Sequence, residues 1–331
     1  MSGTRHSTPG PAQAGPVVSG LTDYGDGITA IDTEYLRPHL DASHLIVHRG
    51  RAAFVDTGTT HAVPLLLAAL ASRGIGPDAV DWVFLTHIHL DHAGGAGALL
   101  TQLPNARVVV HPRGAAHLAE PAKLIAATRR VYGDQAYEAL YGEIVPIAPA
   151  RMLSSEDGMT LTLAGREFSF LHTPGHALHH YVLVDRDAGA LFSGDTFGVS
   201  YREFDVAGAE FVFPATTPTQ FDPEQLHASV DRILGARPRA IYMTHYGRVT
   251  GIAGLGQDLH TGIDAYVALA GRHAAAPERR ARMRADMYEY MSGGLDRNGF
   301  DRDPARRHAL LDPDIGINVD GLLAWLERRA A

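Results

Sequence analysis

The sequence of 331 residues contains no cysteine, which excludes disulfide bonds, thiolate nucleophiles and thiolate metal ligands. Any metal ion must therefore be held by nitrogen and oxygen. The sequence also lacks a run of about eighteen apolar residues, the length that a membrane-spanning helix needs. Basic charge is scarce, because the formal net charge is -8 and Lys123 is the only lysine among 29 basic side chains. Without a basic stripe to neutralise phosphates, no nucleic-acid partner is expected.

The composition is that of a globular protein with a packed core, since 45% of the residues are hydrophobic and 20% are charged. Residues 1–20 are rich in proline, glycine, serine and threonine, and they lack the apolar centre of a secretory signal. We expect these residues to form a disordered tail. A cytoplasmic location without a membrane partner is the corresponding expectation.

Two halves of the sequence each read as several strands followed by a helix, which predicts two packed sheets with helices outside. This is an α/β fold of αββα layering, expected as one domain over residues 21–250. Two helices are expected between Arg113 and Tyr141. After Thr250 the strand signals stop, and residues 251–331 are expected to form a helical C-terminal extension. Its predicted segments are helices at 259–273, 277–291 and 318–330, with a loop at 292–304.

The segment "FLTHIHLDHAGGAG" places four metal-binding side chains directly after an apolar strand. His87 and His89 stand at i and i+2, so they can face one ion, while Asp91 and His92 in the following turn can face a second. Further ligand types follow other predicted strands. These are His176 in "HTPGH", Asp195 in "FSGD" and His245 in "YMTH".

Taken in order, these motifs resemble the metallo-β-lactamase superfamily over roughly residues 27–248. The resemblance implies a four-layer αββα sandwich with two divalent metal ions, most often zinc, although iron or manganese suits the same ligands. It assigns His87, His89 and His176 to one ion and Asp91, His92 and His245 to the other, with Asp195 bridging them. Asp56, in "FVDTG", then corresponds to a carboxylate that orients a ligand histidine.

Two such ions would generate a metal-bridged hydroxide near neutral pH, which makes hydrolysis the natural reaction. We therefore expect a binuclear hydrolase that acts on a small-molecule ester, thioester or lactone. Asp91 can move the proton between the attacking water and the leaving group. Tyr201 and Tyr246 flank the motifs, and either phenol could donate to a developing oxyanion or serve only in packing.

Several alternatives remain open. The chain resembles glyoxalase II in "HTPGH", but the scarcity of lysine argues against a glutathione grip, and lactonases are similar too. Another alternative is a persulfide dioxygenase with a single iron, and a third is a ligand-binding member of the superfamily.

The C-terminal helices could wall the substrate pocket or form a homodimer contact. The apolar residues proposed for such a wall are Ile263, Tyr266, Val267, Met283, Met287, Tyr288 and Met291. The histidines expected to be surface or packing residues are His61, His111, His117, His227, His260, His273 and His308.

Overall fold

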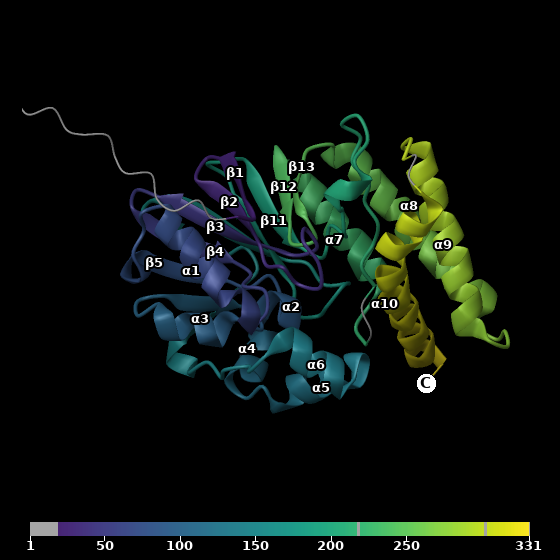
Figure 1. The fold of residues 1–331 in the computed structure, drawn as a ribbon, viewed down its shortest axis with the longest axis horizontal. Coiled ribbons are helices and arrows are strands. Elements are labelled where there is room, and N and C mark those ends of the chain that lie inside the picture. The colour runs from purple at the N-terminus through teal and green to yellow at the C-terminus, as the bar shows by residue number, and fades with distance from the viewer. Residues whose placement is uncertain (1–18, 217–218, 301–302, 331) are drawn as a thin grey trace, which may run out of the picture.

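The structure, a computed structural model, describes residues 19–216, 219–300 and 303–330. The expected tail of residues 1–20 lies outside these ranges except for its last two residues. Two β-sheets pack against each other, with one group of helices outside each sheet (Figure 1). The predicted αββα layering is thus confirmed.

The first sheet has seven strands, which follow one another in space in the order in which they occur in the chain. Its first four strands pair antiparallel as a meander, and β4 to β7 pair parallel with helices between them. The strands are β1 (Leu21–Gly25), β2 (Ile28–Asp32), β3 (Ala42–His48), β4 (Arg51–Val55), β5 (Val80–Phe84), β6 (Arg107–Val110) and β7 (Met152–Ser154).

The second sheet has six strands in the spatial order β13-β12-β11-β10-β9-β8. All its pairs are antiparallel except β11 with β12, which pair parallel. The strands are β8 (Thr160–Leu163), β9 (Arg166–His172), β10 (Tyr181–Asp185), β11 (Ala190–Gly194), β12 (Ala240–Met243) and β13 (Gly247–Val249).

The inner faces of the two sheets form a core of interlocking aromatic side chains. The ring of Phe84 on β5 lies 5.6 Å from that of Phe168 and 5.7 Å from that of Phe170, both on β9 of the other sheet. All three side chains are fully buried. Such contacts hold the two sheets in one register, because buried aromatic rings contribute both burial and a preferred geometry.

Helices cover the outer faces of the sheets. Between residues 112 and 141 the structure has three helices where two were expected, because the helical run is interrupted at Glu120 and Pro121 and again at Gly133. The helices before the extension are α1 (Val63–Ser72), α2 (Leu90–Ala93), α3 (Ala96–Gln102), α4 (Pro112–Ala119), α5 (Ala122–Tyr132), α6 (Asp134–Tyr141) and α7 (Pro223–Gly235).

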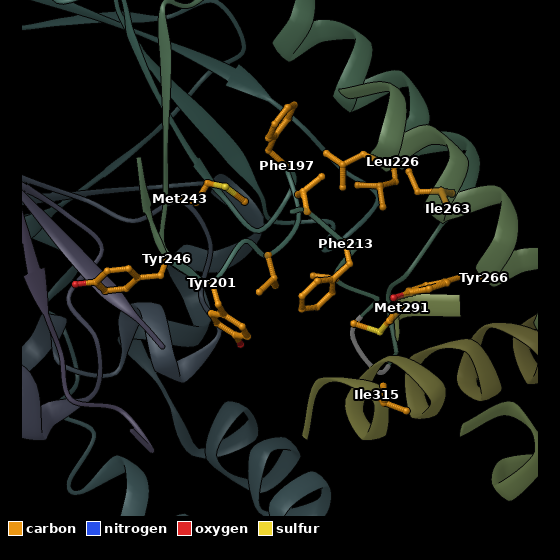
Figure 2. Close-up of a cluster of buried hydrophobic side chains, with 14 of the residues drawn as sticks. Phe197, Tyr201, Phe213, Leu226, Met243, Tyr246, Ile263, Tyr266, Met291 and Ile315 are labelled. Atoms are coloured by element: carbon orange, nitrogen blue, oxygen red, sulfur yellow. The ribbon is translucent and has the colours of Figure 1, made fainter. Parts of the chain in front are cut away.

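The C-terminal extension consists of three long helices, α8 (Ile252–His273), α9 (Arg279–Arg297) and α10 (Pro304–Ala330). They share one hydrophobic cluster with the outer face of the second sheet (Figure 2). The expected domain boundary at residue 250 stays a prediction, and the first helix of the extension begins two residues beyond it. No helix in the described part of the chain is long and apolar enough to span a membrane.

Candidate metal centre

The seven side chains singled out from the sequence lie together where strands of both sheets end. His87 follows β5, His176 follows β9, Asp195 follows β11 and His245 follows β12. His89 precedes the short helix α2, which carries Asp91 and His92 in its single turn. The fold therefore brings four separate segments to one place, and each side chain is held by a turn that leaves a buried strand.

The side chains form two groups, in each of which one ligand atom per residue lies within 4.8 Å of the others. One group contains His87, His89, His176 and Asp195, and the other contains Asp91, His92 and His245. In the first group Nδ1 of His89 lies 2.7 Å from Nε2 of His87 and 3.2 Å from Nε2 of His176. This grouping has the composition that the sequence motifs suggested.

Asp195 connects the two groups, because its two oxygens face different imidazoles. Oδ2 lies 3.3 Å from Nε2 of His176 in the first group. Oδ1 lies 3.2 Å from Nε2 of His92 and 3.7 Å from Nε2 of His245 in the second. A carboxylate in this orientation can reach one ion with each oxygen.

Hydrogen bonds on the far side of the rings fix which nitrogen faces the centre. Nδ1 of His176 donates to the carbonyl oxygen of Ala215 at 3.0 Å, and Nδ1 of His245 donates to that of Leu40 at 3.0 Å. A carbonyl can only accept, so each Nδ1 carries a proton, and in the neutral imidazole each Nε2 presents a lone pair. His92 is held in the same way by the carboxylate of Asp56, at 2.9 Å.

This donor set fits a divalent metal ion. Nε2 of His92 and Oδ1 of Asp195 are buried and have no hydrogen-bond partner within the described residues. Buried polar atoms without a partner are costly, and several lone pairs that converge are stabilised by a cation. Imidazole nitrogen and carboxylate oxygen suit zinc, iron and manganese.

The charges of the centre are strongly coupled. Burial opposes ionisation of Asp91, but His92 and a hydrogen bond with His245 lower the pKa of its carboxyl group to about 2. Burial also disfavours charged His245, yet the carboxylates of Asp195 and Asp91 raise the pKa of this imidazole to about 10. Burial, together with the neighbouring imidazoles, lowers the pKa of His87 and His89 well below the usual value.

Asp56 lies behind the centre and joins three segments. Its carboxylate accepts hydrogen bonds from the backbone N–H of Thr86 at 2.8 Å, from the Thr244 hydroxyl at 2.9 Å and from His92. The residue is fully buried. The sequence expectation that this carboxylate orients a ligand histidine agrees with these contacts.

A cavity of about 310 Å³ opens over the centre. His89, Asp91, Asp195 and His245 form its floor. Apolar residues of α5 line one wall and residues of α10 another. The wall residues are Leu124, Ala127, Val131 and Tyr132 on α5, and Pro313, Asp314, Ile317 and Asn318 on α10.

The two tyrosines proposed from the sequence occupy different surroundings. Tyr201 lines the cavity, and its hydroxyl donates to the Asp314 carboxylate at 3.1 Å. Tyr246 does not line the cavity, and its hydroxyl lies 2.9 Å from Nδ1 of His39. The two side chains point in different directions (Figure 2). Tyr246 therefore serves in packing and hydrogen bonding, and it does not reach a substrate in the cavity.

Three further tyrosines on the cavity side were missed by the sequence analysis. The hydroxyl groups of Tyr35 and Tyr141 lie 2.7 Å apart, and the ring of Tyr132 lies 5.7 Å from that of Tyr141. Burial, reinforced by the Asp91 carboxylate, raises the pKa of the Tyr132 phenol to about 12. These phenols remain protonated and can donate. No spacing in the sequence connects residue 35 with residues 132 and 141, so only the fold reveals the cluster.

The lining of the cavity differs from the sequence expectations in two respects. His117, expected to be a surface or packing residue, lines the cavity, as does Lys123. The apolar residues proposed as a wall on the first two C-terminal helices do not line it. Ile263, Tyr266 and the three methionines are fully buried in the hydrophobic cluster against the second sheet, and Val267 and Tyr288 pack partly buried against it. The third helix, α10, supplies the wall instead, and α9 packs against α10 on the side away from the sheets (Figure 1).

Comparison with known proteins agrees with this geometry. Residues 37–245 match the family model of the metallo-beta-lactamase superfamily, so the chain belongs to that superfamily. A metallo-beta-lactamase fold-containing protein of Sulfurisphaera tokodaii is 31% identical over 178 residues, which are 52% of this chain and 63% of that protein. A hydroxyacylglutathione hydrolase of Aeromonas hydrophila is 30% identical over 204 residues, 61% of this chain and 59% of the relative. The alignments thus span less than two thirds of either relative.

Solved structures share the fold over a greater length. A metallo-beta-lactamase family protein of Thermus thermophilus superposes with a TM-score of 0.64 at 21% identity, covering 92% of this chain and 94% of the other. The archaeal superfamily protein from Sulfolobus tokodaii gives a TM-score of 0.62 at 20% identity, covering 90% of this chain and 98% of the other. At this identity the likeness concerns the fold.

Proposed function

We propose that this protein is a binuclear metal-dependent hydrolase that acts on a small ester, thioester or lactone. The observation that carries the proposal is the pair of ligand groups connected by Asp195, whose oxygens face one group each. His87, His89 and His176 would hold one ion, and Asp91, His92 and His245 the other. Zinc is the proposed metal, with iron or manganese as alternatives. Two such ions supply a water of lowered pKa and polarise the bond that it attacks.

Asp91 is placed to move the proton during hydrolysis. Its side chain is 18% exposed, lines the cavity floor and lies 3.5 Å from Nε2 of His245. The pKa of its carboxyl group, lowered to about 2, keeps Asp91 ionised at neutral pH, and so weak a base can take the proton only from a water that is itself acidified, as two metal ions would make it. Because Asp91 lines the cavity, the leaving group of a substrate bound there could take that proton from it.

The tyrosine cluster is the stronger candidate for stabilising negative charge on the reacting carbonyl. Tyr35 and Tyr141 share one hydrogen bond, so one of the two hydroxyl protons remains for another acceptor. Tyr201 already donates its hydroxyl proton to Asp314. We therefore assign oxyanion donation to the cluster and a positioning role to Tyr201.

The walls of the cavity favour an apolar acyl group. Leu36 and Val131 line the cavity although they are 56% and 48% exposed, and they are two of only three large apolar side chains so exposed in the described residues. Exposed apolar side chains at a concave site favour apolar ligands. A thioester remains within this class, and Lys123 on the cavity wall could meet an anionic thiol part.

The single-iron dioxygenase alternative is less well supported. It would leave Asp91, His92 and His245 without a function, although these residues converge as closely as the first group. A cytoplasmic location and a homodimer contact through the C-terminal helices remain predictions.

A substrate panel tests the proposal. Acyl esters, thioesters and lactones of graded chain length would be assayed with metal-free protein and with protein reconstituted in zinc, iron or manganese. Hydrolysis that depends on metal and increases with acyl length is expected. Absence of hydrolysis in every metal form, with oxygen consumption on a persulfide in the iron form, would instead support the dioxygenase.

A further inference from the structure

A carboxylate from the C-terminal helix α10 faces the cavity beside the metal centre. Asp314 lines the cavity together with His245 and Asp195. Both of its oxygens lie near one donor, the Tyr201 hydroxyl, at 3.1 and 3.2 Å. A carboxylate has about four acceptor positions, and a single O–H can fill only one of them. No other hydrogen bond to Asp314 is present within the described residues, so acceptor positions remain for a ligand in the cavity.

The nearby arginine does not neutralise this carboxylate by direct pairing. Arg37 stacks over the Tyr201 ring, 4.5 Å from its centroid, and forms an ion pair with Glu203. Burial raises the pKa of Asp314 to about 6, and His245, Tyr201 and Arg37 only partly offset this rise. Because Asp314 is only partly exposed, its ionised carboxylate gains free energy from a donor that reaches it within the cavity.

Helix α10 is fixed to the metal centre, so Asp314 has a defined place. Asn318, one turn further along α10, accepts hydrogen bonds from the backbone N–H of Thr216 at 2.6 Å and from its hydroxyl at 2.9 Å. The preceding residue, Ala215, accepts the hydrogen bond from the ligand His176. A short connection thus runs from a metal ligand to the helix that carries Asp314.

We propose that Asp314 is a specificity-determining residue that accepts a hydrogen bond from a neutral donor, a hydroxyl or amide N–H, next to the scissile carbonyl of the substrate. This inference rests on the proposed hydrolase function and adds a polar requirement to it. The remaining walls accommodate the apolar part of the acyl group, so the preferred substrate carries one donor on an otherwise apolar chain. Tyr201 acts through Asp314, because its hydroxyl orients the carboxylate.

Matched thioesters test the proposal. An α-hydroxyhexanoyl thioester and the hexanoyl thioester of the same thiol would be compared on the metal-loaded full chain and on Asp314→Leu, Asp314→Asn and Asp312→Asn. Asp312 is the matched control, because it lies two residues away on α10, pairs with Arg284 and does not line the cavity. Metal content and thermal unfolding of each variant would be recorded in parallel.

We expect the wild-type protein to prefer the hydroxylated thioester by about tenfold or more in kcat/KM, because an acceptor that a bound substrate removes from water and leaves unfilled is costly. Asp314→Leu should abolish that preference, so that the two thioesters are hydrolysed with similar kcat/KM. Asp314→Asn, which keeps an acceptor oxygen, should retain part of it, and Asp312→Asn should retain it all. Equal losses on both thioesters, or no preference in the wild type, would overturn the proposal. If Asp314→Leu fails to fold, Asp314→Asn and Tyr201→Phe test the proposal instead, since each should reduce the preference for the hydroxylated thioester.

Calorimetric binding of α-hydroxyhexanoate and hexanoate separates this inference from the function on which it rests. Tighter binding of the hydroxy acid that disappears in Asp314→Leu would support the role of Asp314 even if no thioester were hydrolysed, in which case the hydrolase proposal alone would fail. Hydrolysis without any such difference would leave the hydrolase proposal standing and reject the role of Asp314.

Discussion

Nδ1 of His92 lies 2.9 Å from Oδ2 of Asp56, and both side chains are fully buried. The same carboxylate accepts hydrogen bonds from Thr86 after β5 and from Thr244 after β12. One side chain thereby ties a ligand histidine to a strand end of each sheet. The Asp56 carboxylate fixes the His92 ring so that Nε2 faces the other members of the second group.

We predict that Asp56→Asn weakens metal binding by about tenfold to a hundredfold, because the amide no longer provides a fixed negative acceptor for His92. Competition with a chelating dye would measure the change. Asp134→Asn is the control, since the side chain of Asp134 is 85% exposed and should leave the affinity unchanged. Unaltered affinity in Asp56→Asn would mean that the carboxylate serves only to join the sheets.

Loss of a ligand should abolish both metal binding and hydrolysis. We expect His89→Ala and Asp195→Ala to lower metal content and activity together, since each removes a donor from the centre. His48→Ala is a suitable control, because His48 ends β3 and does not line the cavity. His117 would be a poor control, since it lines the cavity. A variant at His89 that kept its full metal content would remove this residue from the proposed ligand set.

Ile317 on α10 should set the acyl length that the cavity accepts. We predict that Ile317→Trp shifts the preference to shorter acyl chains and lowers kcat/KM for the longest by about tenfold, because the indole occupies space that one or two methylene groups would fill. Ala309→Trp adds similar bulk on an exposed position of the same helix. Assays over a graded ester series would measure the acyl-length preference of both variants. An identical profile in the two variants would place the acyl group elsewhere.

His44 should make the metal-free protein sensitive to acid. Burial lowers the pKa of this imidazole from 6.5 to about 4, although Asp56 opposes the shift. The unfolded chain therefore binds a proton that the folded chain excludes, so the contribution of His44 to stability is present above pH 6.5 and is lost as the pH falls toward 4. His44 packs against the rings of Phe192 and Tyr242, and a phenylalanine could occupy its place.

We expect wild type to lose about 2 kcal/mol more unfolding free energy than His44→Phe between pH 7 and pH 5. Denaturant unfolding of both proteins at each pH, in the presence of a chelator, would measure this difference in unfolding free energy. If the unfolding free energies of the two proteins fell in parallel with pH, the folded protein would bind the His44 proton as readily as the unfolded chain does.

The convergence of the seven candidate ligands could be predicted, because each belongs to a short motif at or next to the end of a strand. The cavity walls could not. Tyr35, Tyr132 and Asp314 come from segments far apart in the sequence, and they meet only because α5 and α10 pack around the same opening. No local pattern of residue types marks such a meeting.

Some elements could not be predicted because their local sequence is typical of another structure. The pair Gly293 and Gly294 predicted a loop, yet α9 continues to Arg297, because Gly294 packs so closely on Phe211 that a Cβ would lie 2.7 Å from its ring. Strand β1 is largely exposed and β13 has only three residues, so neither shows the alternation of a half-buried strand.

The metal content of the purified chain tests the central claim most directly. Protein reconstituted with zinc, freed of loosely bound metal and measured by inductively coupled plasma mass spectrometry should hold close to two ions per chain. In His245→Ala the content should fall toward one, since only the second group loses a ligand. A wild-type content that stays at one ion after reconstitution with zinc, iron or manganese would contradict the binuclear centre.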